Sequence, residues 1–198
     1  MPPPKPRGEG RSALIAAARK EFDTVGYEGT NSNAIARRAG YAPQTFYRHF
    51  RDKLEVFIAV YEQWTDEEIG FIASASTAEE IAAAILAQHR KSRIFRRSLR
   101  DLTVRHPEMA KARATSRDRQ IEATCRRLPN YARLPRADQV ARLLTFERLC
   151  DGLVEGDFKR LGVAERDVFR LLVDEVRSSL PATNAKRLRK GAPRRSNP

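Results

Sequence analysis

The stretch that decides the fold is Thr45-Phe46-Tyr47-Arg48-His49-Phe50-Arg51-Asp52-Lys53-Leu54-Glu55, read together with the residues that lead into it. Residues 32–51 have the spacing of a helix-turn-helix unit, in which two short helices cross at a small residue. Ala36 is small at the predicted crossing, and Gly40 can adopt the left-handed backbone of the turn. The predicted inner face is apolar: Ile35, Ala39, Tyr41 and Phe46. Any pair of antiparallel helices favours this spacing, so the spacing alone leaves a purely structural hairpin open.

Helical periodicity continues on both sides of this unit. Ser12 is a candidate N-cap for a first helix that stops at Gly26, and Thr30 is a candidate N-cap for a helix through residue 39. Pro43 suits the first turn of a helix to about residue 49, and Asp52 with Glu55 forms a capping box before a long helix. Further helices are predicted at 78–95, 98–105, 107–128, 137–158 and 165–180. No segment alternates like a strand, so the predicted fold class is all-α.

The quoted stretch, with Gly29-Thr30, Ile35-Ala36 and Ala39-Gly40, resembles the N-terminal domain of the tetracycline-repressor (TetR) family of bacterial transcription regulators. The resemblance covers about residues 12–57. It implies a three-helix, helix-turn-helix DNA-binding domain over residues 11–55, followed by a helical effector-binding and dimerisation domain over residues 56–181. It also implies a cytoplasmic, bacterial, homodimeric repressor that a small-molecule ligand releases from a palindromic operator.

The resemblance also implies roles for individual side chains. Phosphate contacts are expected from Thr30, Tyr47, His49 and Lys53, and base contacts from the N-terminal end of the recognition helix, which enters the major groove. The expected base-reading residues are Tyr41, Ala42, Gln44 and Thr45, and Arg48 completes the expected DNA-binding set. A core imidazole remains the alternative for His49, and a solvated side chain remains the alternative for Gln44. Three positions, Asn31, Asn33 and Ala42, depart from the residues that are common in the family.

Two further surfaces are expected in the second domain. The last two helices carry wide apolar stripes that a homodimer would bury, although a large internal core is the alternative. The predicted interface residues are Val140, Leu144, Val154, Phe169, Leu172 and Val176. Aromatic and isolated polar residues are candidates for an effector pocket, although each is as compatible with a core position. These candidates are Trp64, Phe71, His89, Phe95, Phe146 and Glu147.

Charge points to a polyanionic partner. Lys and Arg number 38 against 25 Asp and Glu, giving a formal net charge of +13. Residues 1–10 are expected to form a flexible basic arm, and residues 182–198, with six basic and no acidic side chains, a disordered basic tail. That tail is either a nucleic-acid arm or a solubilising end.

Several classes of protein lack support in the sequence. No catalytic motif is present, the three histidines lack metal-ligand spacing, and no cofactor is implied. The longest apolar run, residues 81–87, is too short for a membrane span. Cys125 and Cys150 are expected to be free thiols. A ligand-independent structural or nucleoid-associated DNA-binding factor remains the alternative to a ligand-responsive repressor.

Overall fold

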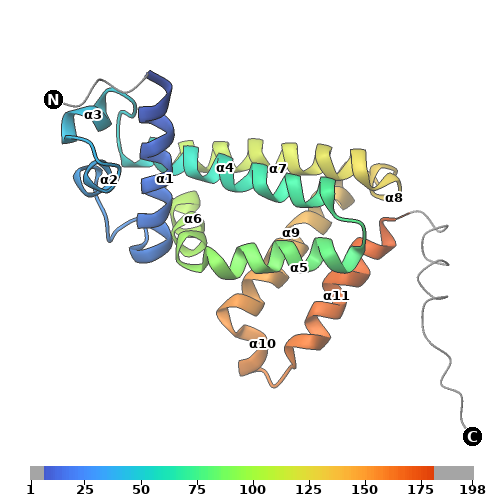
Figure 1. Cartoon of the computed structure of the whole chain (residues 1–198). Helices are drawn as coiled ribbons and strands as arrows, with labels where there is room; N and C mark the ends of the chain where they lie inside the picture. The colour runs from blue at the N-terminus through green and yellow to red at the C-terminus, as the bar shows by residue number, and fades with distance from the viewer. Residues whose placement is uncertain (1–6, 181–198) are drawn as a thin grey trace, which may run out of the picture. The chain divides into compact units, whose positions relative to one another are not determined.

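The computed structural model describes residues 7–180, and within that range every regular element is an α-helix (Figure 1), as the periodicity predicts. The helices are α1 (Arg7–Val25), α2 (Ser32–Arg38), α3 (Pro43–Tyr47), α4 (Lys53–Ser74), α5 (Ala78–Lys91), α6 (Arg93–Arg105), α7 (Pro107–Arg127), α8 (Pro129–Ala132), α9 (Arg136–Glu155), α10 (Asp157–Arg160) and α11 (Glu165–Ser178). Residues 1–6 of the expected arm and the whole expected tail lie outside the described residues.

The contacts divide the chain into two compact units. Within the described residues, the first unit comprises 7–68 and 87–118, and the second comprises 69–86 and 119–180. This division differs from the expected boundary at residue 55. The reason is that the first three helices cannot bury their apolar faces alone, so the start of α4 and all of α6 complete their core.

The core of the first unit is built from the stripes that the sequence pattern predicts. Phe22 of α1 packs edge-on against Phe57 of α4, with ring centroids 4.9 Å apart. Phe57 in turn lies 4.8 Å from Phe95 of α6, and all three rings are fully buried. Ile35 and Phe46 join the same core from α2 and α3. A rigid aromatic core therefore holds the two short helices against the longer ones.

Several helix ends differ from the expected positions. α1 begins at Arg7 rather than Ser12, so residues 7–10 of the expected arm are helical. Asn31 rather than Thr30 caps α2, because its side-chain oxygen accepts a bond from the Ala34 amide. The predicted capping box forms with one change: Asp52 accepts from the Glu55 amide at 2.8 Å, whereas Glu55 reaches back to the amide of Arg51.

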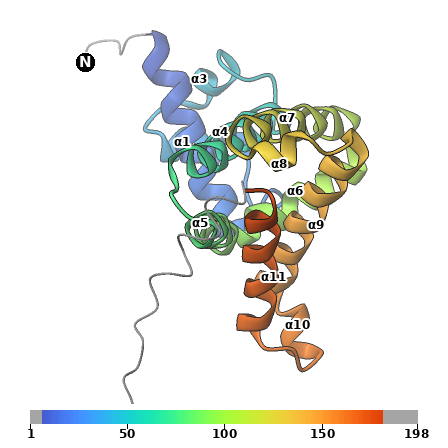
Figure 2. The same ribbon diagram turned by 90° about the vertical axis from the view of Figure 1, so that its right-hand side faces the viewer.

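The second unit has its own core, in which α9 and α11 lie side by side with α10 between them in sequence (Figure 2). The expected helix over 137–158 ends at Glu155, because Gly156 adopts a left-handed conformation with φ of 78°. Leu172 and Val176, both expected at a dimer interface, are buried in the core of this unit. That part of the interface prediction was wrong, because the α11 stripe faces its own protomer.

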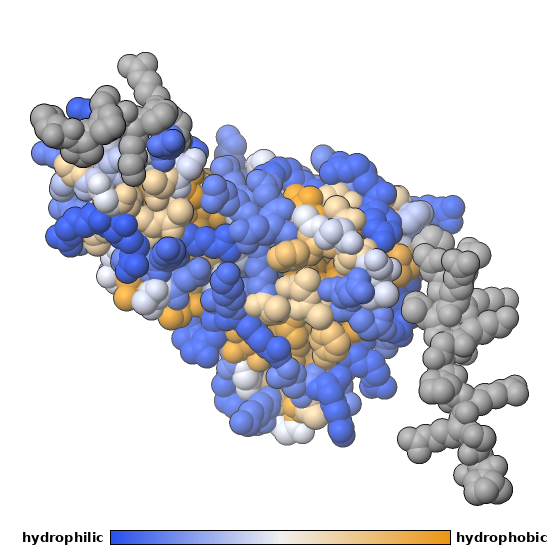
Figure 3. All heavy atoms as spheres, viewed as in Figure 1, coloured by the Kyte–Doolittle hydropathy of each residue, from blue (hydrophilic) through white to orange (hydrophobic). Residues whose placement is uncertain are grey.

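The remaining predicted interface residues are closer to the surface of the second unit. Leu144 is 38% exposed, while Val140, Val154 and Phe169 are half-buried against the core. Leu171 on α11, which the pattern did not single out, is 50% exposed. Figure 3 shows hydrophobic surface between hydrophilic side chains on the face drawn. No helix within residues 7–180 is long and apolar enough to cross a membrane, and Cys125 and Cys150 are free thiols as expected.

Candidate nucleic-acid interface

The α2–turn–α3 segment has the backbone of a helix-turn-helix unit. Gly40 takes the turn with φ of 76°, and the Tyr41 amide donates to the Ala36 carbonyl at 2.9 Å. Ala36 is fully buried, as expected for a small residue at the crossing of two helices. Pro43 occupies the first turn of α3, where its missing N–H is not needed. The sequence prediction for this segment is confirmed.

The outer side of α2 and α3 is polar and carries no negative charge. Gln44 and Tyr47 of α3 are exposed, as is Arg48 directly after it, and 60% of the Tyr47 surface is accessible. Arg37 on α2 is also exposed, although the sequence reasoning did not select it. Residues 29–51 contain four arginines and no Asp or Glu. This composition produces a positive surface that would attract phosphate, and the same acid-free run was available as a signal in the sequence.

Lys53 is held by the loop that connects α1 to α2. Its ammonium group donates to the carbonyl oxygens of Tyr27 at 2.6 Å and Thr30 at 3.0 Å. The same group lies 3.9 Å from the centre of the Tyr27 ring. Partial burial lowers the pKa of Lys53. Lys53 therefore ties the start of α4 to this loop through two of its three N–H groups.

Thr30 is also directed into the protein. Its hydroxyl donates to Glu21 of α1 at 2.9 Å, and only 6% of the residue is exposed. The expected N-cap role for Thr30 was wrong, because Asn31 is the residue that caps α2. Glu21 also accepts a bond from Arg38, the last residue of α2. One carboxylate thus joins α1, α2 and the loop between them.

This Glu21 site has a predictable pH dependence. The hydrogen bond from Arg38, followed by that from Thr30, lowers the pKa of Glu21 below its ordinary value of 4.5. A carboxyl group whose pKa is lower in the folded state stabilises the fold above pH 4.5, and this stabilisation is lost as the pH falls through the folded-state pKa.

We therefore expect Glu21→Gln to lower the free energy of unfolding by about 1 kcal/mol at pH 7, because the Arg38 partner is nearly half exposed. The difference between wild type and variant should shrink below pH 4.5, which urea unfolding at a series of pH values measures. A difference that is the same at pH 7 and pH 3 would contradict a role for the charged carboxylate.

His49 lies against the N-terminal part of α1. A methyl group placed on Gly10 would be 2.8 Å from Nε2 of His49, so the imidazole occupies the space that only glycine leaves. Beside it, the guanidinium of Arg11 lies 5.1 Å above the Phe50 ring. His49 is half-buried, a position intermediate between the expected surface role and the core alternative.

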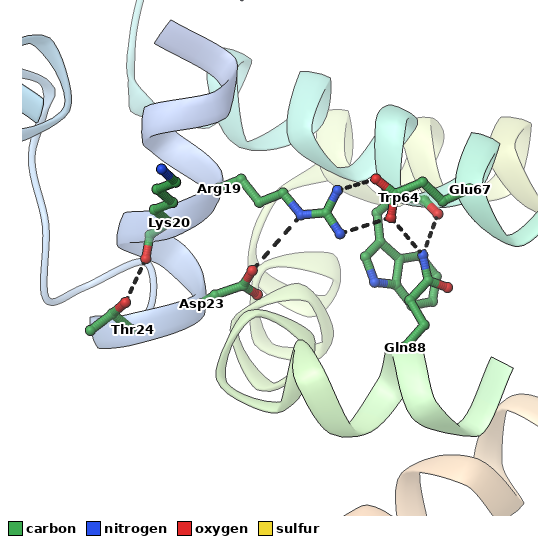
Figure 4. A network of polar contacts seen from close by, with 7 residues as sticks. All are labelled: Arg19, Lys20, Asp23, Thr24, Trp64, Glu67 and Gln88. Carbon is green, nitrogen blue, oxygen red and sulfur yellow. Dashed lines mark hydrogen bonds and ion pairs between the residues drawn. The ribbon is translucent and has the colours of Figure 1, made fainter. Parts of the chain in front are cut away.

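A polar network on the other side of α1 joins three helices of the first unit (Figure 4). Arg19 of α1 makes a bidentate ion pair with Glu67 of α4, and it lies 3.8 Å from Asp23. Gln88 of α5 donates both to Glu67 at 3.1 Å and to the Trp64 carbonyl at 3.0 Å. The orientation of α1 is therefore coupled to α4 and α5.

The six expected pocket residues are divided equally between the two units. Trp64 and Phe95 are core residues of the first unit, and His89 is buried beside Trp64 with ring centroids 5.3 Å apart. Glu147 is buried in the second unit. Phe146 lines a hollow in the second unit, whereas Phe71 and Glu147 do not. Helical spacing does not distinguish a core aromatic from a pocket one, and the pocket role of the other five residues stays a prediction.

The comparisons with known proteins agree with this geometry. Residues 14–60, which run from α1 into α4, match the family model for bacterial regulatory proteins of the tetR family. Residues 14–60 therefore form a domain of the TetR family. Its alignment with the HTH-type transcriptional activator FasR of Mycolicibacterium smegmatis has 36% identity over 70 residues, 35% of this chain and 32% of FasR. An HTH-type transcriptional regulator of Staphylococcus aureus strain USA300 is 34% identical over 30% of this chain and 38% of its own length.

The chain spans about a third of the length of these curated relatives, so their similarity is confined to the TetR domain. They are named as transcriptional regulators, in agreement with the expectation that the chain is not an enzyme.

Solved structures extend the likeness of fold beyond the TetR domain. GusR of Salmonella enterica has a TM-score of 0.66 and 14% identity, covering 89% of this chain and 97% of GusR. A TetR family transcription regulator from Marinobacter aquaeolei VT8 has a TM-score of 0.58 and 18% identity, covering 85% of this chain and 95% of its own. At such identities the likeness establishes the fold alone. Outside the matched domain, the chain thus shares the helical fold of these solved structures.

Proposed function

We propose that this TetR-family protein is a sequence-specific DNA-binding regulator of transcription, and that it acts as a homodimeric repressor. The observation that supports this most is the exposed, acid-free surface of α2 and α3 within the matched domain. Gln44 reads a base from the major groove, with Tyr41, Ala42 and Thr45 at the same end of α3. Tyr47, Arg48 and His49 hold the phosphate backbone from the rest of the helix and its end.

Two residues expected to contact phosphate receive a different proposed role. Thr30 and Lys53 order the loop between α1 and α2 through Glu21 and the backbone carbonyls. The ordered loop then presents the N-terminus of α2 to the DNA backbone. Lys53 keeps one N–H group for a phosphate in addition to this positioning role.

The proposed homodimer uses apolar side chains that α9 and α11 leave exposed, namely Leu144 and Leu171. Two copies of α3 would then read two half-sites related by a twofold axis. We expect selection from random DNA, followed by footprinting, to recover an inverted repeat with half-site centres about one or two helical turns apart. Recovery of a single asymmetric site protected by one protomer would contradict the dimeric reading mode.

Release by an effector is the final part of the proposal. α4 contributes Lys53, which bonds the loop between α1 and α2 in the first unit, and Ile72, which lines a hollow in the second unit. One helix therefore carries residues of both the candidate DNA-binding domain and the hollow. A ligand that binds the DNA-free conformation more tightly than the DNA-bound one would lower operator affinity, whereas equal affinity would shift nothing. A DNA affinity that no small molecule changes would favour the ligand-independent alternative.

A further inference from the structure

The second unit contains a hollow that six helices line. It has an empty volume of about 500 Å³, which includes its opening to solvent. Its lining is mainly aliphatic and aromatic, from Ile72 of α4, Ile81 and Ile85 of α5, Leu128, Leu143, Phe146 and Val176. A concave apolar surface assembled from so many elements is the shape in which small molecules are bound.

Each polar group of the lining already has a partner within residues 7–180. The Thr124 hydroxyl donates to the Gln120 carbonyl at 2.8 Å, and the Ser179 hydroxyl donates to the Glu175 carbonyl at 3.3 Å. The Tyr131 hydroxyl donates to the Gln139 carbonyl at 2.6 Å, and burial raises the pKa of Tyr131 to about 12. None of these three side chains therefore brings charge to the hollow at neutral pH.

The two charged residues of the lining compensate each other. Nη1 of Arg142 lies 3.1 Å from Oε1 of Glu175 and also donates to the Ser178 hydroxyl at 3.1 Å. About a third of each of the two charged side chains is exposed, which places this pair where the hollow meets solvent. A ligand carboxylate would meet the guanidinium of Arg142, whose charge Glu175 already neutralises. A ligand ammonium would meet the carboxylate of Glu175, whose charge Arg142 already neutralises.

We propose that this hollow binds an uncharged, largely apolar small molecule. A charged group brought against the apolar lining would lose its hydration without gaining an uncompensated partner. The free-energy cost of dehydrating an alcohol or an ester is far smaller. This assignment gives the chemical class of the effector, and it rests on the function proposed above for the step in which binding releases DNA. Binding itself is independent of DNA.

The test compares three ligands that share one chain and differ in charge. Calorimetric titration of the full chain with octan-1-ol, octanoate and octylammonium, without DNA, should give octan-1-ol an affinity at least tenfold higher than that of either ion. Leu143→Trp, which fills the hollow from α9, should abolish octan-1-ol binding. Arg148→Gln changes an exposed arginine of the same helix and should leave all three affinities unchanged.

Two variants at the charged pair test the compensation directly. Glu175→Gln leaves Arg142 uncompensated and should raise the affinity for octanoate at least tenfold. Arg142→Gln leaves Glu175 uncompensated and should raise the affinity for octylammonium by a similar factor. Thermal unfolding of each variant checks that the fold is retained.

Three results would overturn the proposal. They are octanoate or octylammonium binding wild type as tightly as octan-1-ol, octan-1-ol binding unchanged in Leu143→Trp, and no binding of octan-1-ol at all. Octan-1-ol binding without any change in operator affinity would support the site and contradict effector release, so the two proposals fail separately.

Discussion

Replacing Gln44 with alanine is expected to abolish discrimination at one base pair in each half-site of the operator. Gln44 is exposed in the first turn of α3, where its amide can donate and accept in one plane and so match the N6 and N7 groups of adenine. Such a pair contributes about 1–3 kcal/mol, so loss at two half-sites corresponds to roughly a 30-fold or greater loss of operator affinity.

The measurement is a binding titration on the selected operator, on operators changed at single positions, and on unrelated DNA. Gln44→Ala should bind unrelated DNA as wild type does, because a neutral side chain makes no contribution to counterion release. Asn33→Ala, at an exposed residue of α2, is the matched control and should leave the base preference unchanged. An unaltered base preference in Gln44→Ala would assign Gln44 to solvent, the alternative left open by the sequence.

Replacing Gly10 with alanine is expected to weaken DNA binding while the fold is retained or stabilised. Alanine inside a helix is more favourable than glycine by roughly 0.5–1 kcal/mol. At this position, however, the added methyl group would lie 2.8 Å from Nε2 of His49, so the imidazole must move from its place beside α1. If His49 holds a phosphate, each half-site loses a hydrogen bond, and operator affinity should fall roughly tenfold.

A double-mutant cycle separates this effect from a general disturbance of α1. In a His49→Ala background, Gly10→Ala should cause no further loss of DNA affinity, because the side chain that it displaces is absent. Thermal unfolding of wild type, the two single variants and the double variant measures whether Gly10→Ala retains or raises the stability of the fold. Equal losses of DNA affinity in the two backgrounds would show that Gly10 acts through the helix and not through His49.

The local parts of the fold were predictable because their causes are local. Gly26 and Gly40 end helical segments with positive φ, Pro43 begins α3, and Asp52 caps the amide of Glu55, each through interactions within a few residues. The breaks at Ser92 and Gly156 were not predicted, because the apolar periodicity of both segments continues past the break. The spacing of apolar residues shows which face of a helix is buried. It does not reveal a single residue that leaves the helical conformation and ends the helix.

The candidate DNA surface was largely predictable, while the roles of individual side chains within it were not. Exposure of Gln44, Tyr47 and Arg48 follows from the period of α3 and the burial of Phe46. The partners of Thr30 and Lys53 lie nine to 26 residues away in the chain, on α1 and the following loop. Such contacts depend on how the helices pack, and a motif that names the residue types does not contain them.

The helical fold class, the helix-turn-helix unit and the polar outer side of α2 and α3 could be predicted from the sequence, because each follows from periodicity, steric freedom and charge over short segments. The direction in which the larger apolar residues point depends on tertiary packing. Trp64 and Phe95 complete the core of the first unit, Leu172 and Val176 that of the second, and the hollow beside Arg142 and Glu175 arises where side chains of six helices meet without filling the space. An apolar residue at helical spacing carries the same pattern in a core, a pocket or an interface, and the distinction depends on which other helices it meets in three dimensions.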